Sequence, residues 1–160
     1  MDEPMLKEIV SLTGELIRFR TTHDHPDEIL RCADFVGDWL DRHRIPHRRS
    51  DQENLPTLTV VPEADRAPVL LMSHLDVVDA PPSLFEPFLR DGRLYGRGSI
   101  DDKYAVALSL VLLRERWRRL ETEKGGFEDL PLGLLITGDE EIGGFRGAGR
   151  GLQTLRAGFA

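Results

Sequence analysis

The feature that most constrains the fold is an apolar run from Pro131 to Thr137, which Gly138 ends. A run of this length between turn residues predicts a β-strand. Its side chains do not alternate between apolar and polar, a pattern that is typical of a strand buried on both faces. We therefore expect an α/β fold, in which helices cover the faces of a central sheet.

Apolar residues at helical spacing predict three helices. The first carries an apolar stripe over residues 5–16, and Asp2 and Pro4 are typical of its start. The second covers residues 26–45, because it begins at a proline and the next proline disfavours helix in the residue before it. The third covers residues 104–120.

Short β-branched or apolar runs between prolines predict two more strands, over residues 57–61 and 69–72. Residues 79–98 are rich in proline and glycine and predict a long irregular connection. Residues 143–151 hold five glycines and predict a loop or a loosely started helix. In sheets of this kind, ligands bind beyond the carboxyl ends of the strands.

Composition and charge exclude several classes of protein. The chain has 160 residues, enough for one domain with its own core, and its single cysteine, Cys32, cannot form an internal disulfide. A net charge of −7 argues against nucleic acid as the main partner. The apolar run over residues 105–113 is too short to cross a bilayer, and the acidic N-terminus is unlike a secretory signal. A cytoplasmic protein with no membrane partner is expected.

A histidine and a carboxylate follow the predicted strand that ends at Met72, in the segment S-H-L-D-V-V. Side chains two residues apart in an extended segment point the same way, so His74 and Asp76 share one side. Leu75 and Val77 then face the core. A histidine beside a carboxylate suits a metal ion, because one ring nitrogen binds the ion while an acid fixes the other. Taken alone, the segment is more typical of a strand end with solvated polar residues.

Three acids follow the apolar run over residues 131–137, in the segment G-D-E-E-I-G-G, with no basic residue beside them. Adjacent side chains cannot both aim at one point in regular structure. Glu140 and Glu141 therefore predict divided roles, one as a metal ligand and one as a proton carrier. Taken alone, the segment is typical of a solvated acidic turn.

A third polar segment, Y-G-R-G-S-I-D-D-K, precedes the helix predicted over residues 104–120. Its glycines suggest a phosphate-binding loop, but Asp101 and Asp102 stand where backbone N–H groups should receive the anion, and carboxylates repel phosphate. The two acids fit helix caps that complement the helix dipole. The same geometry could hold an aspartate rigidly against a cation.

Together the three segments place one histidine and several carboxylates at strand or helix ends, on one plausible edge of the sheet. Packing so many acids together costs free energy unless cations neutralise them. The combination therefore predicts a dinuclear metal site in which one carboxylate bridges two ions.

The chain resembles the co-catalytic zinc metallopeptidase and deacylase family, through S-H-L-D-V-V, L-Y-G-R-G-S-I-D-D-K and T-G-D-E-E-I-G-G in the family's order. That family includes aminoacylase, acetylornithine deacetylase, succinyl-diaminopimelate desuccinylase, carnosine dipeptidase and glutamate carboxypeptidase. The resemblance covers most of the chain. It implies a zinc-exopeptidase-like catalytic domain, here incomplete, with a central mixed sheet and helices on both faces.

The resemblance also implies a set of metal ligands. His74 binds one ion, Glu141 binds the other, and Asp101 bridges the two. Two zinc ions are expected, although cobalt or manganese can serve the same ligand types. The family further implies a cis peptide bond between Asp101 and Asp102.

The activity that the resemblance implies is hydrolysis of an amide bond in a small peptide or an N-acyl amino acid. Two zinc ions activate a water molecule and polarise the amide carbonyl. Glu140 is the general base that takes the proton of the water and returns it to the leaving amine. Asp76 orients His74. The family pattern is compatible with a homodimer in a full-length form.

Some parts that the family carries have no counterpart within residues 1–160. They are a further acidic ligand beyond Glu141, a distal histidine, and an inserted lid domain. Residues 1–160 are therefore expected to form the N-terminal portion of a metallohydrolase catalytic domain, without the lid/dimerisation domain and the C-terminal portion. As an isolated chain it is expected to hydrolyse amides poorly, because half of each metal's protein ligands is absent.

Two other interpretations stay open at this stage. The chain is also consistent with an inactive remnant of the family that binds a metal or a partner. Arginines on the helix over residues 104–120 could form a basic recognition surface, although a packed helix with a solvated cationic side explains them better. The remaining histidines are expected on the surface without a metal role: His23, His25, His43 and His47.

Overall fold

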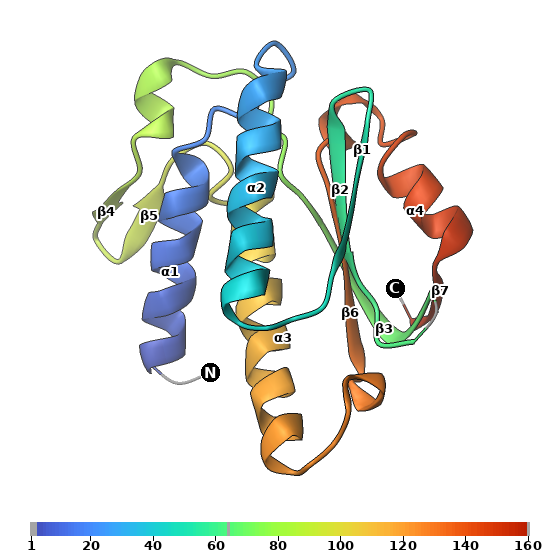
Figure 1. Ribbon diagram of the computed structural model, residues 1–160. Helices are drawn as coiled ribbons and strands as arrows, with labels where there is room; N and C mark the ends of the chain where they lie inside the picture. The colour runs from blue at the N-terminus through green and yellow to red at the C-terminus, as the bar shows by residue number, and fades with distance from the viewer. Residues whose placement is uncertain (1–2, 64, 160) are drawn as a thin grey trace.

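A computed structural model describes residues 3–63 and 65–159 (Figure 1). Its centre is a mixed sheet of five strands, in the spatial order β1–β2–β6–β3–β7. Strand β6 pairs in parallel with β3 and antiparallel with β2. The strands are β1 (Arg48–Gln52), β2 (Leu55–Val60), β3 (Arg66–His74), β6 (Leu132–Thr137) and β7 (Arg156–Phe159).

Helices cover both faces of this sheet, as the α/β prediction requires. Figure 1 shows α1 (Glu3–Ile17), α2 (Pro26–Arg42) and α3 (Lys103–Thr122) on one face and α4 (Ala148–Thr154) on the other. Leu134 and Ile136 of β6 belong to the main core cluster, which also holds side chains from α1, α2 and α3. The intervening Leu135 faces Gly151 of α4. The prediction that residues 131–137 form a strand buried on both faces is therefore confirmed.

The three predicted helices are confirmed to within a few residues at their ends, and the start signal at Asp2 lies outside the described residues. Arg114 on α3 is buried, binds Glu8 and Glu115, and stacks over the ring of Trp39 at 5.6 Å. This arginine is part of the packing of α3 and is not on a recognition surface. Of the helices in the described part of the chain, none is long and apolar enough to cross a membrane.

The expectation of an irregular connection over residues 79–98 is wrong in part. A short hairpin of β4 (Phe88–Arg90) and β5 (Arg93–Tyr95) lies within it. Its turn, Asp91–Gly92, has positive φ at both residues, which is the geometry that an Asp-Gly pair favours in two-residue hairpins. The Asp-Gly dipeptide could have predicted this hairpin from the sequence, but the nearby prolines favoured an irregular segment.

Strand β1 was also not predicted from the sequence. It is an edge strand whose residues are mostly exposed, so it has no apolar run to reveal it. It pairs with β2 through a two-residue turn at Glu53 and Asn54, both with positive φ. Its sequence, R-R-S-D-Q, shows that pairing with a neighbour can make a strand where local pattern does not.

Gly133 shows how closely the central strands approach, and it supplies a test of the sheet. A Cβ at Gly133 would lie 2.7 Å from the Cβ of Ala67 and 2.9 Å from the carbonyl oxygen of Val60. We expect Gly133→Ala to lower the free energy of unfolding by about 1–3 kcal/mol, measured by urea denaturation. In the matched control Gly37→Ala, the new Cβ meets its nearest neighbour at 3.6 Å, within a helix. Alanine there should raise stability by up to about 1 kcal/mol, and equal losses in both variants would contradict this account.

Candidate metal centre

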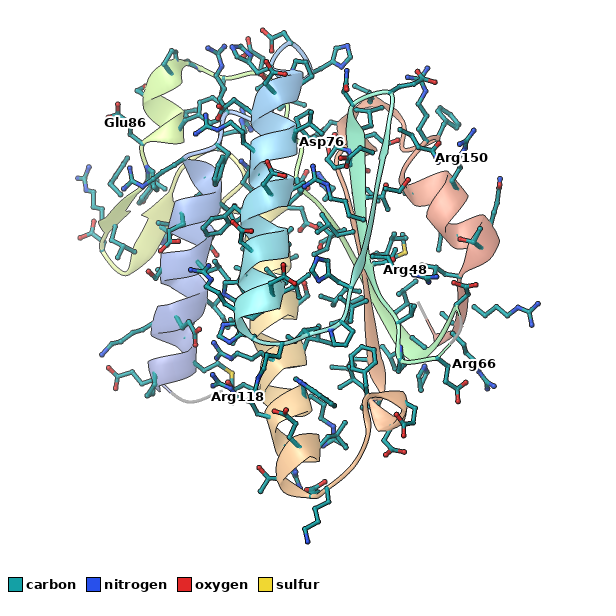
Figure 2. All side chains as sticks on the ribbon, in the orientation of Figure 1. Arg48, Arg66, Asp76, Glu86, Arg118 and Arg150 are labelled. Carbon is teal, nitrogen blue, oxygen red and sulfur yellow. The ribbon has the colours of Figure 1, made fainter. Side chains whose placement is uncertain are left out.

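The candidate site lies where β3 and β6 end side by side. The two strands run in parallel, and His74 pairs with Thr137 in their register. The segments that follow them therefore begin at the same edge of the sheet. Figure 2 shows Asp76 at this edge, near the top of the view.

His74 has both ring nitrogens in contact with an acceptor. Its Nδ1 lies 2.9 Å from the backbone carbonyl oxygen of Asp76, and its Nε2 lies 3.0 Å from Oδ1 of Asp101. A carbonyl oxygen can only accept, so Nδ1 carries a proton and donates it. This bond fixes the ring so that Nε2 faces the carboxylates.

The surroundings of His74 favour its charged form. Burial alone would lower the pKa of this imidazole, but the hydrogen bond and the negative charge of Asp76, together with the hydrogen bond to Asp101, raise the pKa to about 9. Without a metal ion, both ring N–H groups therefore donate at neutral pH. A metal ion at Nε2 would have to replace that proton.

The carboxylate of Asp76 joins the two segments that follow the strands. Oδ1 accepts the backbone N–H of Glu140 at 3.1 Å, and Oδ2 accepts that of Glu141 at 2.8 Å. Oδ1 also lies 3.4 Å from Nδ1 of His74. Asp76 is only 4 % exposed, so these N–H groups and the imidazolium replace the water around its charge.

Asp101 and Asp102 stand directly before α3. The peptide bond between them is cis, as the family resemblance implied. The side chain of Asp101 is 75 % exposed and faces His74 from the solvent side. Asp102 is at the N-cap position of α3, and burial raises the pKa of its carboxyl group.

Glu140 and Glu141 lie in a single turn of 3₁₀-helix that ends in glycine. Oε2 of Glu140 is 3.8 Å from Nε2 of His74, and this side chain is 56 % exposed. Among the described residues, Glu141 makes no hydrogen bond or ion pair with His74 or Asp101. Burial raises the pKa of Glu141, and the negative charge of Asp101 acts in the same direction against the positive charge of His74.

Two further residues belong to this region although the sequence gave them no role. Asp139 is buried, and its Oδ2 accepts the backbone N–H groups of Arg146 and Gly147, so it holds the glycine-rich loop beside Glu141. His23 was expected on the surface without a function. It is exposed, but it lines a cavity of about 390 Å³ that also contains Glu141. Asp139 is one of the three acids of the segment G-D-E-E-I-G-G, which was the available signal, whereas no local pattern pointed to His23, because its cavity joins distant parts of the chain.

The structure thus brings four of the five predicted site residues into direct contact: His74, Asp76, Asp101 and Glu140. The fifth, Glu141, is joined to them through its backbone N–H on Asp76. The other three histidines are half-buried, and among them His43 packs on the ring of Trp39. Another cavity, of about 790 Å³, is lined by residues of β1, β2 and α4, among them Arg48 and Arg150, and contains none of the five.

The donor atoms of the site are of the types that zinc binds, but too few of them converge among the described residues to hold an ion. An imidazole nitrogen and a carboxylate oxygen converge at 3.0 Å, and both are zinc ligands. Within residues 3–63 and 65–159, however, no three His, Cys, Asp or Glu side chains are grouped so that they could hold a metal ion. The described residues therefore include donor atoms of kinds that zinc binds, but they do not make up a metal site.

Several known proteins are similar in sequence to this chain. Residues 70–159 match the model of peptidase family M20/M25/M40. The chain is 41% identical over 159 residues to a cysteinylglycine-S-conjugate dipeptidase of Corynebacterium striatum, covering 92% of this chain and 34% of that protein. It is 39% identical over 95 residues to N-fatty-acyl-amino acid synthase/hydrolase PM20D1 of Xenopus tropicalis, covering 56% of this chain and 18% of that protein.

The fold is also similar to that of a solved enzyme. Human carnosine dipeptidase 1 superposes with a TM-score of 0.64 at 19% identity, covering 94% of this chain and 37% of that one. The chain thus spans about a third of the length of its dipeptidase relatives. The match over residues 70–159 includes all five predicted site residues, and the chain belongs to peptidase family M20/M25/M40.

Proposed function

We propose that this chain forms part of the catalytic site of a metal-dependent hydrolase that cleaves amide bonds in small peptides or N-acyl amino acids. The observation that carries this proposal is the convergence of His74 Nε2 and Asp101 Oδ1 beside two glutamates at the ends of parallel strands. The substrate class follows from its relatives, a dipeptidase and an enzyme of N-fatty-acyl amino acids.

In this proposal His74, Asp101 and Glu141 would hold the metal. Zinc supplies a Lewis acid that polarises the amide carbonyl and makes water more acidic. The Nδ1–H bond to the carbonyl of Asp76 keeps Nε2 of His74 aimed at Asp101. The carboxylate of Asp76 fixes the backbone from which Glu140 and Glu141 extend.

Glu140 is the general base in the proposed reaction. Its carboxylate is exposed and lies 3.8 Å from Nε2 of His74, so it can reach a water molecule on the open side of the site. It takes one proton from the water as the oxygen attacks the amide carbon. It then returns that proton to the leaving nitrogen, and the products are a carboxylate and a free amine.

We also propose that residues 1–160 are the N-terminal portion of a catalytic domain. The chain spans about a third of its dipeptidase relatives, and the described residues do not make up a metal site by themselves. The second candidate is an inactive remnant of the family that binds a metal. The small number of converging ligand side chains among the described residues favours this candidate as well. Turnover by the isolated chain would exclude the remnant.

The test has two parts. Calorimetry measures zinc binding by the purified chain, and an activity assay then measures turnover on a panel of dipeptides and N-acyl amino acids. We expect His74→Ala to weaken zinc binding at least tenfold, because it removes a ligand. Glu140→Gln is the matched control, since it should leave the affinity unchanged and remove any turnover. Turnover by the unmodified chain would exclude the remnant, and unchanged affinity in His74→Ala would exclude the proposed centre.

A further inference from the structure

Lys103 is an unusual residue for its position. It is the first residue of α3, where the helix dipole favours anions, and its side chain is fully buried. A cation placed there costs free energy unless specific partners stabilise it. Its partners are two backbone carbonyl oxygens at the end of α1, because Nζ donates to Leu16 at 2.8 Å and to Phe19 at 2.7 Å.

These hydrogen bonds join the negative end of α1 to the positive start of α3. The aliphatic stem of Lys103 is held as well. A Cβ at Gly98 would lie 2.9 Å from its Cγ and Cδ, so only glycine leaves room for the stem at this position. Lys103 is two residues from Asp101, so holding Nζ restrains the backbone from which the carboxylate of Asp101 extends.

The same end of α1 also holds the segment that carries His74. The side chain of Thr21 donates to the carbonyl of Leu75 at 2.6 Å, and the carbonyl of Thr21 accepts the N–H of Val77 at 3.0 Å. Thr21 is fully buried. We call residues 16–21 the anchor segment, because both halves of the His74–Asp101 pair are tied to it.

We propose that Lys103 and Thr21 are positioning residues, which set Nε2 of His74 against Oδ1 of Asp101 by binding their segments to the end of α1. Neither touches the reacting atoms. The functional importance of this positioning rests on the proposed function, in which His74 and Asp101 are metal ligands. The geometry itself can be measured without metal or substrate.

The experiment uses nitrogen-15 NMR of the metal-free chain at a single neutral pH, observing the ring of His74. We expect Lys103→Met and Thr21→Val each to move the Nε2 signal toward that of the exposed His23. The ring N–H proton should exchange with water about tenfold faster, as expected when a hydrogen bond is lost. The control is Leu113→Ala, a buried position ten residues further along the same helix. It should lower the melting temperature without moving the His74 signal.

Two results would overturn the proposal. One is an unchanged His74 signal in both positioning variants. The other is an equal shift in Leu113→Ala, which would show that loss of stability alone loosens the pair. If Lys103→Met does not fold, the result for Thr21→Val alone tests the proposal, because this change removes one hydrogen bond and keeps the volume of the side chain. Zinc calorimetry tests the proposed function separately, so failure of either proposal is visible by itself.

Discussion

Asp76→Ala is expected to lower the free energy of unfolding by about 3–5 kcal/mol, the usual cost of removing one partner from a buried charged pair. The change leaves the N–H groups of Glu140 and Glu141 without their acceptor. It also leaves the buried imidazolium of His74 without its buried carboxylate neighbour, 3.4 Å from Nδ1. Urea denaturation, followed by tryptophan fluorescence, measures this loss.

Asp79→Ala is the matched control for this variant. Asp79 is in the same segment, but its side chain is 72% exposed and pairs with Arg20 at 3.2 Å near the surface. Such pairs contribute about 0–1 kcal/mol, so the control should be close to the unmodified chain. Asp76→Asn should be intermediate, because it keeps one acceptor oxygen. Similar losses in the Asp76 and Asp79 alanine variants would show that the buried carboxylate has no special role.

Stability of the metal-free chain is expected to fall as the pH rises from about 6.5 to about 8. The pKa of His74 is about 9 in the folded chain and 6.5 when unfolded. A raised pKa means that the folded state binds the proton more tightly. Its contribution is complete below pH 6.5 and is lost by about pH 9, and the difference amounts to about 3 kcal/mol.

Lys103 opposes this trend at higher pH. Burial lowers the pKa of Lys103 to about 8, from 10.5. The unfolded chain then binds this proton more tightly, so the cost of the buried charge is present below pH 8 and is relieved between about pH 8 and 10.5. We therefore expect the free energy of unfolding to fall from about pH 6.5, to reach a minimum near pH 8–9, and to rise again at higher pH.

Urea denaturation across pH 6 to 10 measures this profile, and His74→Gln tests its cause. Glutamine does not titrate, so the fall between pH 6.5 and 8 should disappear while the recovery above pH 8 stays. The same fall in His74→Gln would assign the effect to another group. Zinc added to the unmodified chain should bind more tightly as the pH rises toward 9, because it displaces the proton on Nε2.

The sequence was sufficient where a structure depends on local pattern. The run over residues 131–137 and the helical stripes have a strong hydrophobic period, and the corresponding elements formed where expected. The proximity of His74 and Glu140 was also accessible, because they lie at the carboxyl ends of two strands that share one edge of the sheet.

It was insufficient where a residue owes its role to distant partners. The buried state of Lys103 depends on carbonyl groups more than 80 residues away in the chain. The two N–H donors on Asp76 belong to residues 140 and 141. Strand β1 has an edge position and polar residues, and only its partner β2 makes it a strand.

The parallel pairing of β3 and β6 has a practical consequence. A chain that leaves one end of a sheet must travel back before it can run the same way again, and α3 makes that return. Its far end and the turn over residues 123–130 therefore lie at the opposite pole of the molecule, at the bottom of Figure 1. A fluorophore, affinity tag or fused domain attached at that pole would be separated from His74 by the full height of the sheet.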